Sequence, residues 1–298
     1  MKALLSLIML VFTLVPMAFA DDLNDIPLTD FKSNKAISLA EFDKSKPTYL
    51  KLWATWCQPC MAQMPHFQKL HETYGEKINI IAVNININEE MKYIDDVITK
   101  FGLTMPVLLD NEGQLSEALG LVGTPFSVLI NTNNDVVYTT HESDELLDTF
   151  IAKLAKGETL ASKSDDMLSE QAKQKIIAPW QTGNHTLFFT ATWCDWYLKD
   201  SRPKMANDCK DIQSAITKKF QQSGDKSWHG FVNHLWTDDK ALTDFITLYQ
   251  LGFPFNIDNN GVLFTHFNIR NIPTIIHIEN GKVVEKITGD EIKQLLAK

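Results

Sequence analysis

The two halves of the chain carry the same landmarks in the same order. The tetrapeptide Ala-Thr-Trp-Cys at residues 54–57 recurs at residues 191–194, an offset of 137. Four later landmarks recur at an offset of 148, where Pro106, Asp110, Gly113 and Pro125 match Pro254, Asp258, Gly261 and Pro273. Chance could produce one shared tetrapeptide, but five landmarks in one order indicate two copies of a single unit. Because each copy alternates strand and helix patterns and ends in a strand pair, we predict an α/β fold with two mixed central sheets flanked by helices.

The first copy contains a Cys-x-x-Cys pair at the expected seam between a strand and a helix. The apolar run 49–53 predicts a buried strand, and apolar residues then recur at helical spacing from Met61 to Tyr74. Cys57 is therefore expected at a helix N-terminus, where unpaired N–H groups and the helix dipole favour a thiolate. Its spacing from Cys60 allows one reversible disulfide, the basis of thiol–disulfide exchange. The alternative is half of a zinc site, but the sequence has no second Cys-x-x-Cys.

The first twenty residues have the features of a secretory signal peptide. Lys2 supplies the positive start, residues 4–15 are apolar, and Ala18-Phe19-Ala20 offers small residues for cleavage. The apolar run is short for a membrane span, and an uncleaved anchor is the alternative. We therefore expect an exported protein, without membrane insertion once the leader is removed, in a compartment where disulfides persist. A bacterial periplasm fits this expectation.

The remaining chain is long enough for two domains. It has 298 residues with the leader, of which 44% are hydrophobic, and a net charge of −9. No basic cluster is evident, so nucleic acid is excluded as an expected partner. We predict a signal peptide at 1–20, a first domain at 21–157, a linker at 158–178 and a second domain at 179–298. The linker is rich in Ser, Lys, Asp, Glu and Gln, with a helical pattern at 166–176.

Across residues 23–154 the first copy resembles the thioredoxin superfamily, specifically the TlpA/ResA/CcmG-like periplasmic reductases. The residues that carry this resemblance include the motif Trp53-Ala54-Thr55-Trp56-Cys57-Gln58-Pro59-Cys60, the run Met105–Asp110 and the tripeptide Gly123-Thr124-Pro125. The resemblance implies two tandem thioredoxin-like domains, because the second copy also ends like a plain thioredoxin. It is specific for fold and chemistry and much less specific for substrate.

The resemblance also implies a catalytic set and a kind of partner. Cys57 would attack a client disulfide and Cys60 would resolve the mixed disulfide, with Cys57 exposed and Cys60 tucked behind it. Thr124-Pro125 would be a cis peptide beside the pair, offering a partner chain an edge to hydrogen-bond. The redox group would be the Cys57–Cys60 disulfide itself, without a cofactor. Clients would be disulfide-bearing proteins such as apocytochrome c or a metal-site assembly factor, and the reductant a membrane thiol carrier.

Four further residues are expected to support this site, and one departs from the family. Trp56, Gln58 and Pro59 belong to the motif, and Pro59 shortens the turn between the cysteines. Lys51 stands where relatives often have Asp or Asn. It is either a buried lysine with a shifted pKa that tunes Cys60 or moves a proton, or an edge residue that reaches water. The run Asn84–Asn88 lacks the buried acid of many relatives, so their proton-transfer details are not carried over.

The second copy has a changed cysteine pair. Tyr197 stands in place of the second cysteine of its motif, but an offset of 149, shared by Val83-Asn84 and Val232-Asn233, carries Cys60 onto Cys209. Cys194 and Cys209 are therefore candidates for a disulfide beside Ile272 and Pro273. One continuous helix would hold them about 22 Å apart, so we expect a loop within 197–207. A structural disulfide is preferred, and a second redox site or two free thiols are the alternatives.

The sequence also allows other functions. The second copy could be a client-binding or partner-binding module, with only a local redox or holdase role for the first. The enzyme could also act as a net oxidant or isomerase, since the sequence does not fix the direction. A copper site at Met61, Met64, His66 and His71 is disfavoured, because the apolar spacing already places both methionines in a core. We therefore expect no metal site.

Overall fold

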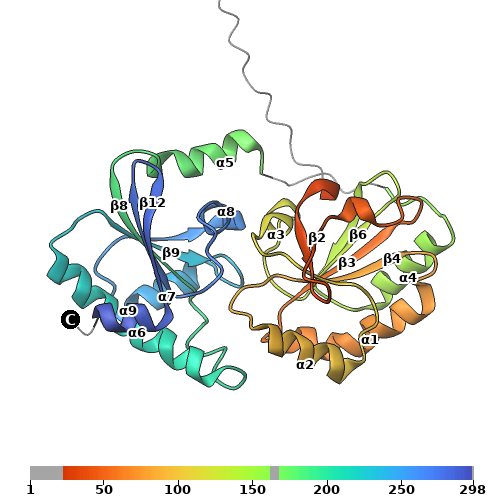
Figure 1. Cartoon of the computed structure of the whole chain (residues 1–298), viewed down its shortest axis with the longest axis horizontal. Coiled ribbons are helices and arrows are strands. Elements are labelled where there is room, and N and C mark those ends of the chain that lie inside the picture. The colour runs from red at the N-terminus through yellow and green to blue at the C-terminus, as the bar shows by residue number, and fades with distance from the viewer. Residues whose placement is uncertain (1–22, 162–167, 297–298) are drawn as a thin grey trace, which may run out of the picture.

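The computed structural model describes residues 23–161 and 168–296, which form two units, each built on its own sheet (Figure 1). The N-terminal unit has a seven-stranded sheet and the C-terminal unit a five-stranded sheet. Both sheets contain parallel and antiparallel pairs, so the predicted α/β fold with two mixed sheets is confirmed. The predicted signal peptide and residues 162–167 of the predicted linker lie outside the described residues.

The sheet of the N-terminal unit has the order β2-β1-β5-β4-β3-β6-β7. Its strands are β1 (Leu28–Asp30), β2 (Ala36–Ile37), β3 (Thr48–Trp53), β4 (Asn79–Asn84), β5 (Val107–Leu109), β6 (Phe126–Ile130) and β7 (Val136–Thr140). Strands β3, β4 and β5 run parallel, while β6 returns antiparallel to β3. β3 is therefore a central strand, and its C-terminal end lies beside the start of β6.

The helices of the N-terminal unit follow the expected alternation with strands. They are α1 (Gln58–Tyr74), α2 (Met91–Phe101), α3 (Gln114–Ala118) and α4 (Glu145–Ala155). In α1, one face buries Cys60, Met64, Phe67 and Leu70, which recur at helical spacing. Burying this face against the sheet fixes the first turn of α1 at the end of β3, which is where the cysteines are.

The C-terminal unit repeats the same strand order without two edge strands. Its sheet is β10-β9-β8-β11-β12, which matches β5-β4-β3-β6-β7 position by position. The strands are β8 (Asn184–Thr190), β9 (Trp228–Asn233), β10 (Phe255–Asp258), β11 (Thr274–Glu279) and β12 (Lys282–Thr288). The helices are α5 (Glu170–Ile177), which lies in the predicted linker, α6 (Pro203–Ser223), α7 (Asp239–Tyr249), α8 (Val262–His266) and α9 (Gly289–Leu296).

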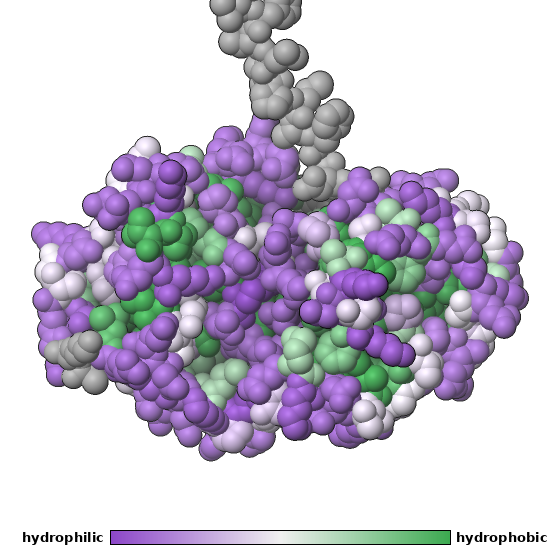
Figure 2. Space-filling view, in the orientation of Figure 1, coloured by the Kyte–Doolittle hydropathy of each residue, from purple (hydrophilic) through white to green (hydrophobic). Residues whose placement is uncertain are grey.

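The two units pack against each other rather than standing apart. Helix α3 contacts α8, and Lys173 on α5 forms a 2.7 Å ion pair with Glu117 on α3. One cluster of buried apolar side chains runs through both units and includes Trp56, Leu121, Trp193 and Leu235. Polar side chains cover most of the face in Figure 2, with apolar patches scattered between them. Within the described ranges, no helix is both long and apolar enough to cross a bilayer.

A disulfide joins Cys194 to Cys209 in the C-terminal unit. Their Cα atoms lie 6.1 Å apart, and 15 positions separate them in sequence. Cys194 lies in the turns after β8 and Cys209 lies in α6. Because α6 begins at Pro203, the loop predicted over 197–207 is present but ends at Arg202. Two disulfides account for all four cysteines, so the alternative of two free thiols is wrong.

Removing the Cys194–Cys209 disulfide should lower the melting temperature. Closing a loop of this length restricts the unfolded chain, so the double variant Cys194→Ser/Cys209→Ser should lose about 3 kcal/mol and melt about 6 to 12 °C lower. The matched control is Cys57→Ser/Cys60→Ser, which opens a shorter loop and should melt closer to the wild type. Calorimetry of the three proteins checks this, and an unchanged melting temperature for the first variant would contradict a stabilising role.

Candidate active site around the Cys57–Cys60 disulfide

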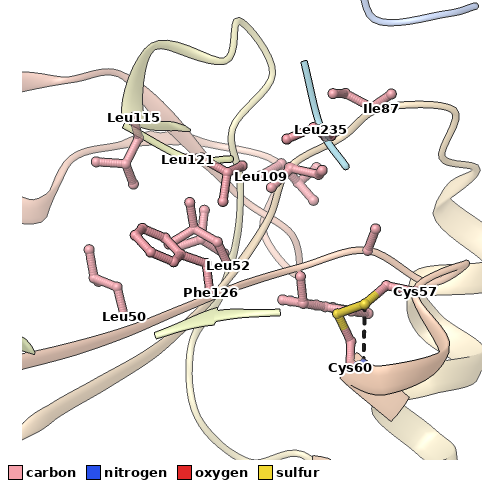
Figure 3. Close-up of a cluster of buried hydrophobic side chains, with 14 of the residues drawn as sticks. Leu50, Leu52, Cys57, Cys60, Ile87, Leu109, Leu115, Leu121, Phe126 and Leu235 are labelled. Carbon is pink, nitrogen blue, oxygen red and sulfur yellow. Dashed lines mark hydrogen bonds between the residues drawn. A yellow bond between two sulfur atoms is a disulfide. The ribbon is translucent and has the colours of Figure 1, made fainter. Parts of the chain in front are cut away.

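The Cys57–Cys60 disulfide lies at the N-terminus of α1. Cys57 caps the helix, and its Sγ accepts a 3.1 Å hydrogen bond from the Cys60 N–H, drawn as a dashed line in Figure 3. The two Cα atoms are 5.2 Å apart. Pro59 falls in the first turn, where a missing N–H costs no helical hydrogen bond. Because the free N–H groups of this turn and the helix dipole point at Cys57, a reduced Cys57 would be favoured as a thiolate.

A cis peptide bond joins Thr124 to Pro125 just before β6. The register pairs Leu52 of β3 with Phe126 of β6, so the cis-proline loop (residues 121–125) lies at the same end of the sheet as the disulfide. Phe126 and Leu52 lie side by side in Figure 3. His141 Nδ1 donates to the Pro125 carbonyl at 2.8 Å, and the buried Thr124 Oγ1 has no hydrogen-bond partner. The predicted pair and the predicted cis bond therefore come together.

Lys51 is fully buried in the middle of β3. It pairs with Ala82 on one side and Ser127 on the other, so the alternative of an edge residue that reaches water is wrong. Its Nζ donates to Gln63 Oε1 at 2.6 Å and to Ser127 Oγ at 3.4 Å. Burial lowers the pKa of Lys51 to about 7. A lysine that titrates near neutral pH therefore lies beneath α1.

A hydrogen-bond chain links Lys51 to the cis-proline loop. Gln63, one turn after Cys60 on α1, accepts from Lys51 and donates its Nε2–H to the His141 carbonyl at 3.0 Å. The His141 ring then donates to Pro125. Sequence reasoning missed Gln63 and His141. Gln63 could have been found from the sequence, because it follows Cys60 by three residues on the same helix. His141 lies far from the motif, and no sequence pattern points to it.

A partly buried acid follows β4, contrary to the expectation that none is present. Glu89 accepts hydrogen bonds from the Thr55 N–H at 2.6 Å, the Thr55 hydroxyl at 2.5 Å and Asn84 Nδ2 at 3.0 Å. Burial raises the pKa of Glu89, although these hydrogen bonds oppose the rise. Glu89 is the first acid after Val83-Asn84, one residue beyond the polar run read in the sequence, and it fixes the turn just before Cys57.

The C-terminal unit packs against the residues on both sides of Cys57. Trp56 stacks on Trp193 with ring centroids 5.0 Å apart, and Tyr197 and Trp236 complete a four-ring cluster. The Tyr197 hydroxyl accepts the Gln58 N–H at 3.3 Å. Cys57 and Cys60 both have 0% exposed surface, so the expectation of an exposed Cys57 is wrong. That expectation considered the first copy alone, whereas rings of the second copy pack against Trp56 and Gln58, the two sequence neighbours of Cys57.

The candidate metal ligands lie in ordinary structural contacts. Met64 is buried in the core, as its spacing predicts, while His66 contacts Asp148 at 3.0 Å and His71 contacts Thr104 at 3.1 Å. Over the described ranges, no group of three or more His, Cys, Asp or Glu side chains is arranged to hold a metal ion. The redox-capable group that the geometry offers is the cysteine pair itself.

Protein stability should depend on pH through Lys51. Between about pH 7 and pH 10 the unfolded chain holds a proton on this amine that the folded chain has released. The free energy of unfolding should therefore rise with pH in this window, by up to ~1.4 kcal/mol per pH unit. Urea unfolding of the wild type and of Lys51→Met should show that the variant loses this rise. Lys69→Met, at an exposed position on α1, is the control, and equal slopes in all three proteins would contradict the assignment.

Comparisons with known proteins match the part of the chain that holds this site. A family model described as Redoxin matches residues 19–150. The thiol-disulfide oxidoreductase ResA of Bacillus thuringiensis subsp. konkukian is 30% identical over 130 residues, which cover 43% of this chain and 73% of that protein. ResA of Halalkalibacterium halodurans is 31% identical over 120 residues, covering 39% and 66%. The structure of StoA from Bacillus subtilis is 25% identical and covers 43% of this chain and 92% of that chain, with a TM-score of 0.36.

These matches define the family of the N-terminal unit. The chain spans about two thirds of the first curated relatives, 66% of one and 63% of another. The Redoxin match contains both the cysteine pair and the cis-proline loop, and it ends before the C-terminal unit begins. The chain therefore belongs to the ResA-like thiol–disulfide oxidoreductases of the thioredoxin superfamily.

Proposed function

We propose that this protein reduces disulfides in exported client proteins through Cys57 and Cys60. The single observation that carries the proposal is the Cys57–Cys60 disulfide at the N-terminus of α1, within the segment that matches ResA. The reduced pair is a two-electron donor, and the helix N-terminus favours the thiolate that starts the exchange. No cofactor is needed, because the cysteine pair carries the electrons.

The reaction proceeds by two exchanges. The Cys57 thiolate attacks one sulfur of the client disulfide, forming a mixed disulfide and releasing a client thiolate. The Cys60 thiolate then attacks Cys57 Sγ, which releases the second client sulfur and leaves the Cys57–Cys60 disulfide. Two electrons pass to the client, and the protons of the two enzyme thiols end on the two client thiols. Thr124 and Pro125 hold the client backbone, and Lys51 acts through Gln63 as a positioning residue beneath α1.

We also propose two thioredoxin-like domains at residues 21–157 and 179–298, joined by a linker at 158–178. The identical order of five strands in the two sheets supports this division. A cis peptide bond at Ile272-Pro273 matches the one at Thr124-Pro125. The second domain is degenerate as a redox unit, since Tyr197 replaces the second cysteine of its motif, and Cys194–Cys209 is its structural crosslink. A relay role for that disulfide is the alternative.

The proposed setting is the periplasm, reached by a cleaved leader at residues 1–20. Two disulfides in a chain with four cysteines support an oxidising compartment. Clients are disulfide-bearing proteins, of the apocytochrome c or metal-site assembly type. A membrane thiol carrier would return electrons to Cys57–Cys60, since the pair is left oxidised after each turnover.

A second candidate function is a client-binding or partner-binding module. The observation in its favour is that Cys57 is buried and the C-terminal unit contacts its neighbour Gln58, an arrangement that limits turnover. Two results together would favour this module. The full-length wild type would reduce no client disulfide, and a client would bind Cys57→Ser/Cys60→Ser as tightly as it binds the wild type. Loss of client reduction only in the double variant would favour the enzyme.

Trapping should identify the nucleophile. The Cys60→Ser variant should accumulate mixed disulfides with client proteins, because the second exchange is blocked after Cys57 has attacked. The Cys57→Ser variant should accumulate few or none. Non-reducing gels with mass spectrometry of the adducts provide the measurement. Equal trapping by both variants would rule out Cys57 as the unique attacking thiol.

The reduction potential should fix the direction. We expect a value nearer the roughly −270 mV of thioredoxin than the roughly −120 mV of a strong periplasmic oxidant. Equilibration with glutathione buffers, read by mass spectrometry at Cys57 and Cys60, gives this potential separately from that of Cys194 and Cys209. A value above about −180 mV, the range of isomerases, would replace the reductase with an oxidant or isomerase.

A further inference from the structure

Residues of the C-terminal unit occupy the cis-proline loop of the N-terminal unit. The Trp236 N–H donates to the Val122 carbonyl at 3.3 Å, and His234 Nε2 donates to the Leu121 carbonyl at 2.5 Å. Both acceptors lie just before Thr124-Pro125. One common way for a protein to bind an extended peptide is to pair its own free backbone N–H and C=O groups with those of the peptide. Residues 234–236 thus take the place where a client backbone would bind.

The Trp236 ring is fitted closely to this loop. A Cβ atom placed on Gly123 would lie 2.8 Å from the Trp236 Nε1 atom, so the ring sits where only glycine leaves room. The ring also packs edge-on against Trp56, with centroids 5.8 Å apart. Trp236 adopts a φ of +51°, a left-handed conformation that is rare for a bulky side chain. Such a conformation persists where surrounding contacts hold it, and it clusters at functional sites.

Trp236 is not simply a core residue. Its side chain keeps 43% of its surface exposed, whereas the neighbouring Trp56 and Trp193 are buried. Val122, its backbone partner, is 56% exposed. The contact is therefore a ring laid against the outside of the cis-proline loop, at the rim of the covered disulfide. Trp236 therefore lies at a rim where a client ring can compete for its place.

The same contact occurs in the opposite direction. Asn88, in the loop after β4, donates its N–H to the Arg270 carbonyl at 2.9 Å and accepts the Ile272 N–H on its Oδ1 at 2.9 Å. Arg270 and Ile272 precede the cis proline of the C-terminal unit, as Val122 and Thr124 precede that of the N-terminal unit. Each unit therefore holds the cis-proline loop of the other with the loop that follows its own second parallel strand.

We propose that residues 234–236 are an internal occupant of the client edge, which keeps Cys57–Cys60 closed until a client with an aromatic residue beside its disulfide displaces Trp236. The inference rests on the proposed function, and it names the client class. Gly123 provides the space for a ring, Trp56 the apolar wall and Val122 the backbone acceptor. A client that binds this edge favours the separated units, because only that state offers the site.

Access to Cys57 tests the closed state without any client. The protein is reduced with dithiothreitol, transferred to N-ethylmaleimide, and the adduct on Cys57 is followed by mass spectrometry. Trp236→Ala, and Asn88→Ala from the opposite side, should each be modified at least about tenfold faster than the wild type, a change of about 1.4 kcal/mol in the opening equilibrium. The matched control is Trp196→Ala. This aromatic residue is 64% exposed, its indole N–H donates to the Thr192 carbonyl, and its ring packs edge-on against Tyr197 of its own unit.

The outcomes of this experiment are decisive in both directions. The control should stay within about twofold of the wild type, since it does not touch the cis-proline loop. Unchanged modification rates in Asn88→Ala and in a folded Trp236→Ala would overturn the closed state. Equal acceleration in all three variants would also overturn it, because general loosening would then explain the effect. If Trp236→Ala does not fold, Asn88→Ala alone decides, since it removes the hydrogen bond from the Ile272 N–H to Asn88 Oδ1 and so weakens the contact from the N-terminal unit.

Two peptides test the client class. They share one disulfide and one sequence, except that Phe or Ser stands next to the first cysteine. The reduced wild-type enzyme should reduce the Phe peptide with a kcat/KM about tenfold higher, because only that peptide replaces the Trp236 ring. Equal values would overturn the aromatic preference. If neither the wild type nor Trp236→Ala reduces either peptide, while maleimide still shows the accelerated access, the proposed reductase function fails and the closed edge stands.

Discussion

The stack of Trp56 on Trp193 is the contact on which the arrangement of this molecule depends. Each ring precedes the first cysteine of its copy, and each indole N–H is fixed within its own unit, on the Ile87 carbonyl at 2.7 Å and the Leu235 carbonyl at 2.8 Å. The polar edge of each ring is therefore satisfied, and its apolar face is left for the other unit. Because both rings lie at the ends of matching strands, stacking them brings the two cysteine ends together, and Ile87 and Leu235 lie close to each other in Figure 3.

This packing changes the chemistry open to the cysteine pair. A helix N-terminus favours a thiolate, but a site without exposed surface disfavours any charge that loses its water. In the closed arrangement the two effects oppose each other, and a client is also excluded from Cys57 by volume. Separation of the units would restore solvent to Cys57 and give a client access to it. One movement would therefore control both the stability of the Cys57 thiolate and the entry of clients. Arg202 strengthens the closed form by lying 3.6 Å over the Tyr93 ring and donating to Thr55 at 2.6 Å.

The sequence predicted what local patterns and the repeat determine. The two mixed sheets follow from alternating strands and helices, and the place of Cys57 follows from the switch between strand and helix periods. What it could not predict depends on long-range pairing. Lys51 was open between edge and interior because only the return of β6 beside β3 makes that strand central. Glu89 was missed because its partner, Thr55, lies 34 residues away. The contacts of the C-terminal unit with Trp56 and Gln58, on either side of the buried Cys57, depend on shape matching between two units, and no periodicity carries that information.

The packing of the two units around Trp56 and Trp193 also accounts for the residue that replaces the second motif cysteine in the C-terminal copy. In the C-terminal unit this position holds Tyr197, whose ring stacks on Trp236 at 5.9 Å and whose hydroxyl accepts the Gln58 N–H. A cysteine there could supply neither the ring nor a hydroxyl at that reach. Cys209 lies further along α6 than Cys60 does along α1, and Cys194 still forms a disulfide with it. The motif position that Tyr197 occupies is therefore available to pack against the N-terminal unit. If the C-terminal unit is degenerate as a redox unit, as we propose, its copy has exchanged the chemistry of its motif for a surface that fits the active end of its neighbour. On that proposal, the motif is altered directly after Cys194 because Tyr197 contacts the N-terminal unit there.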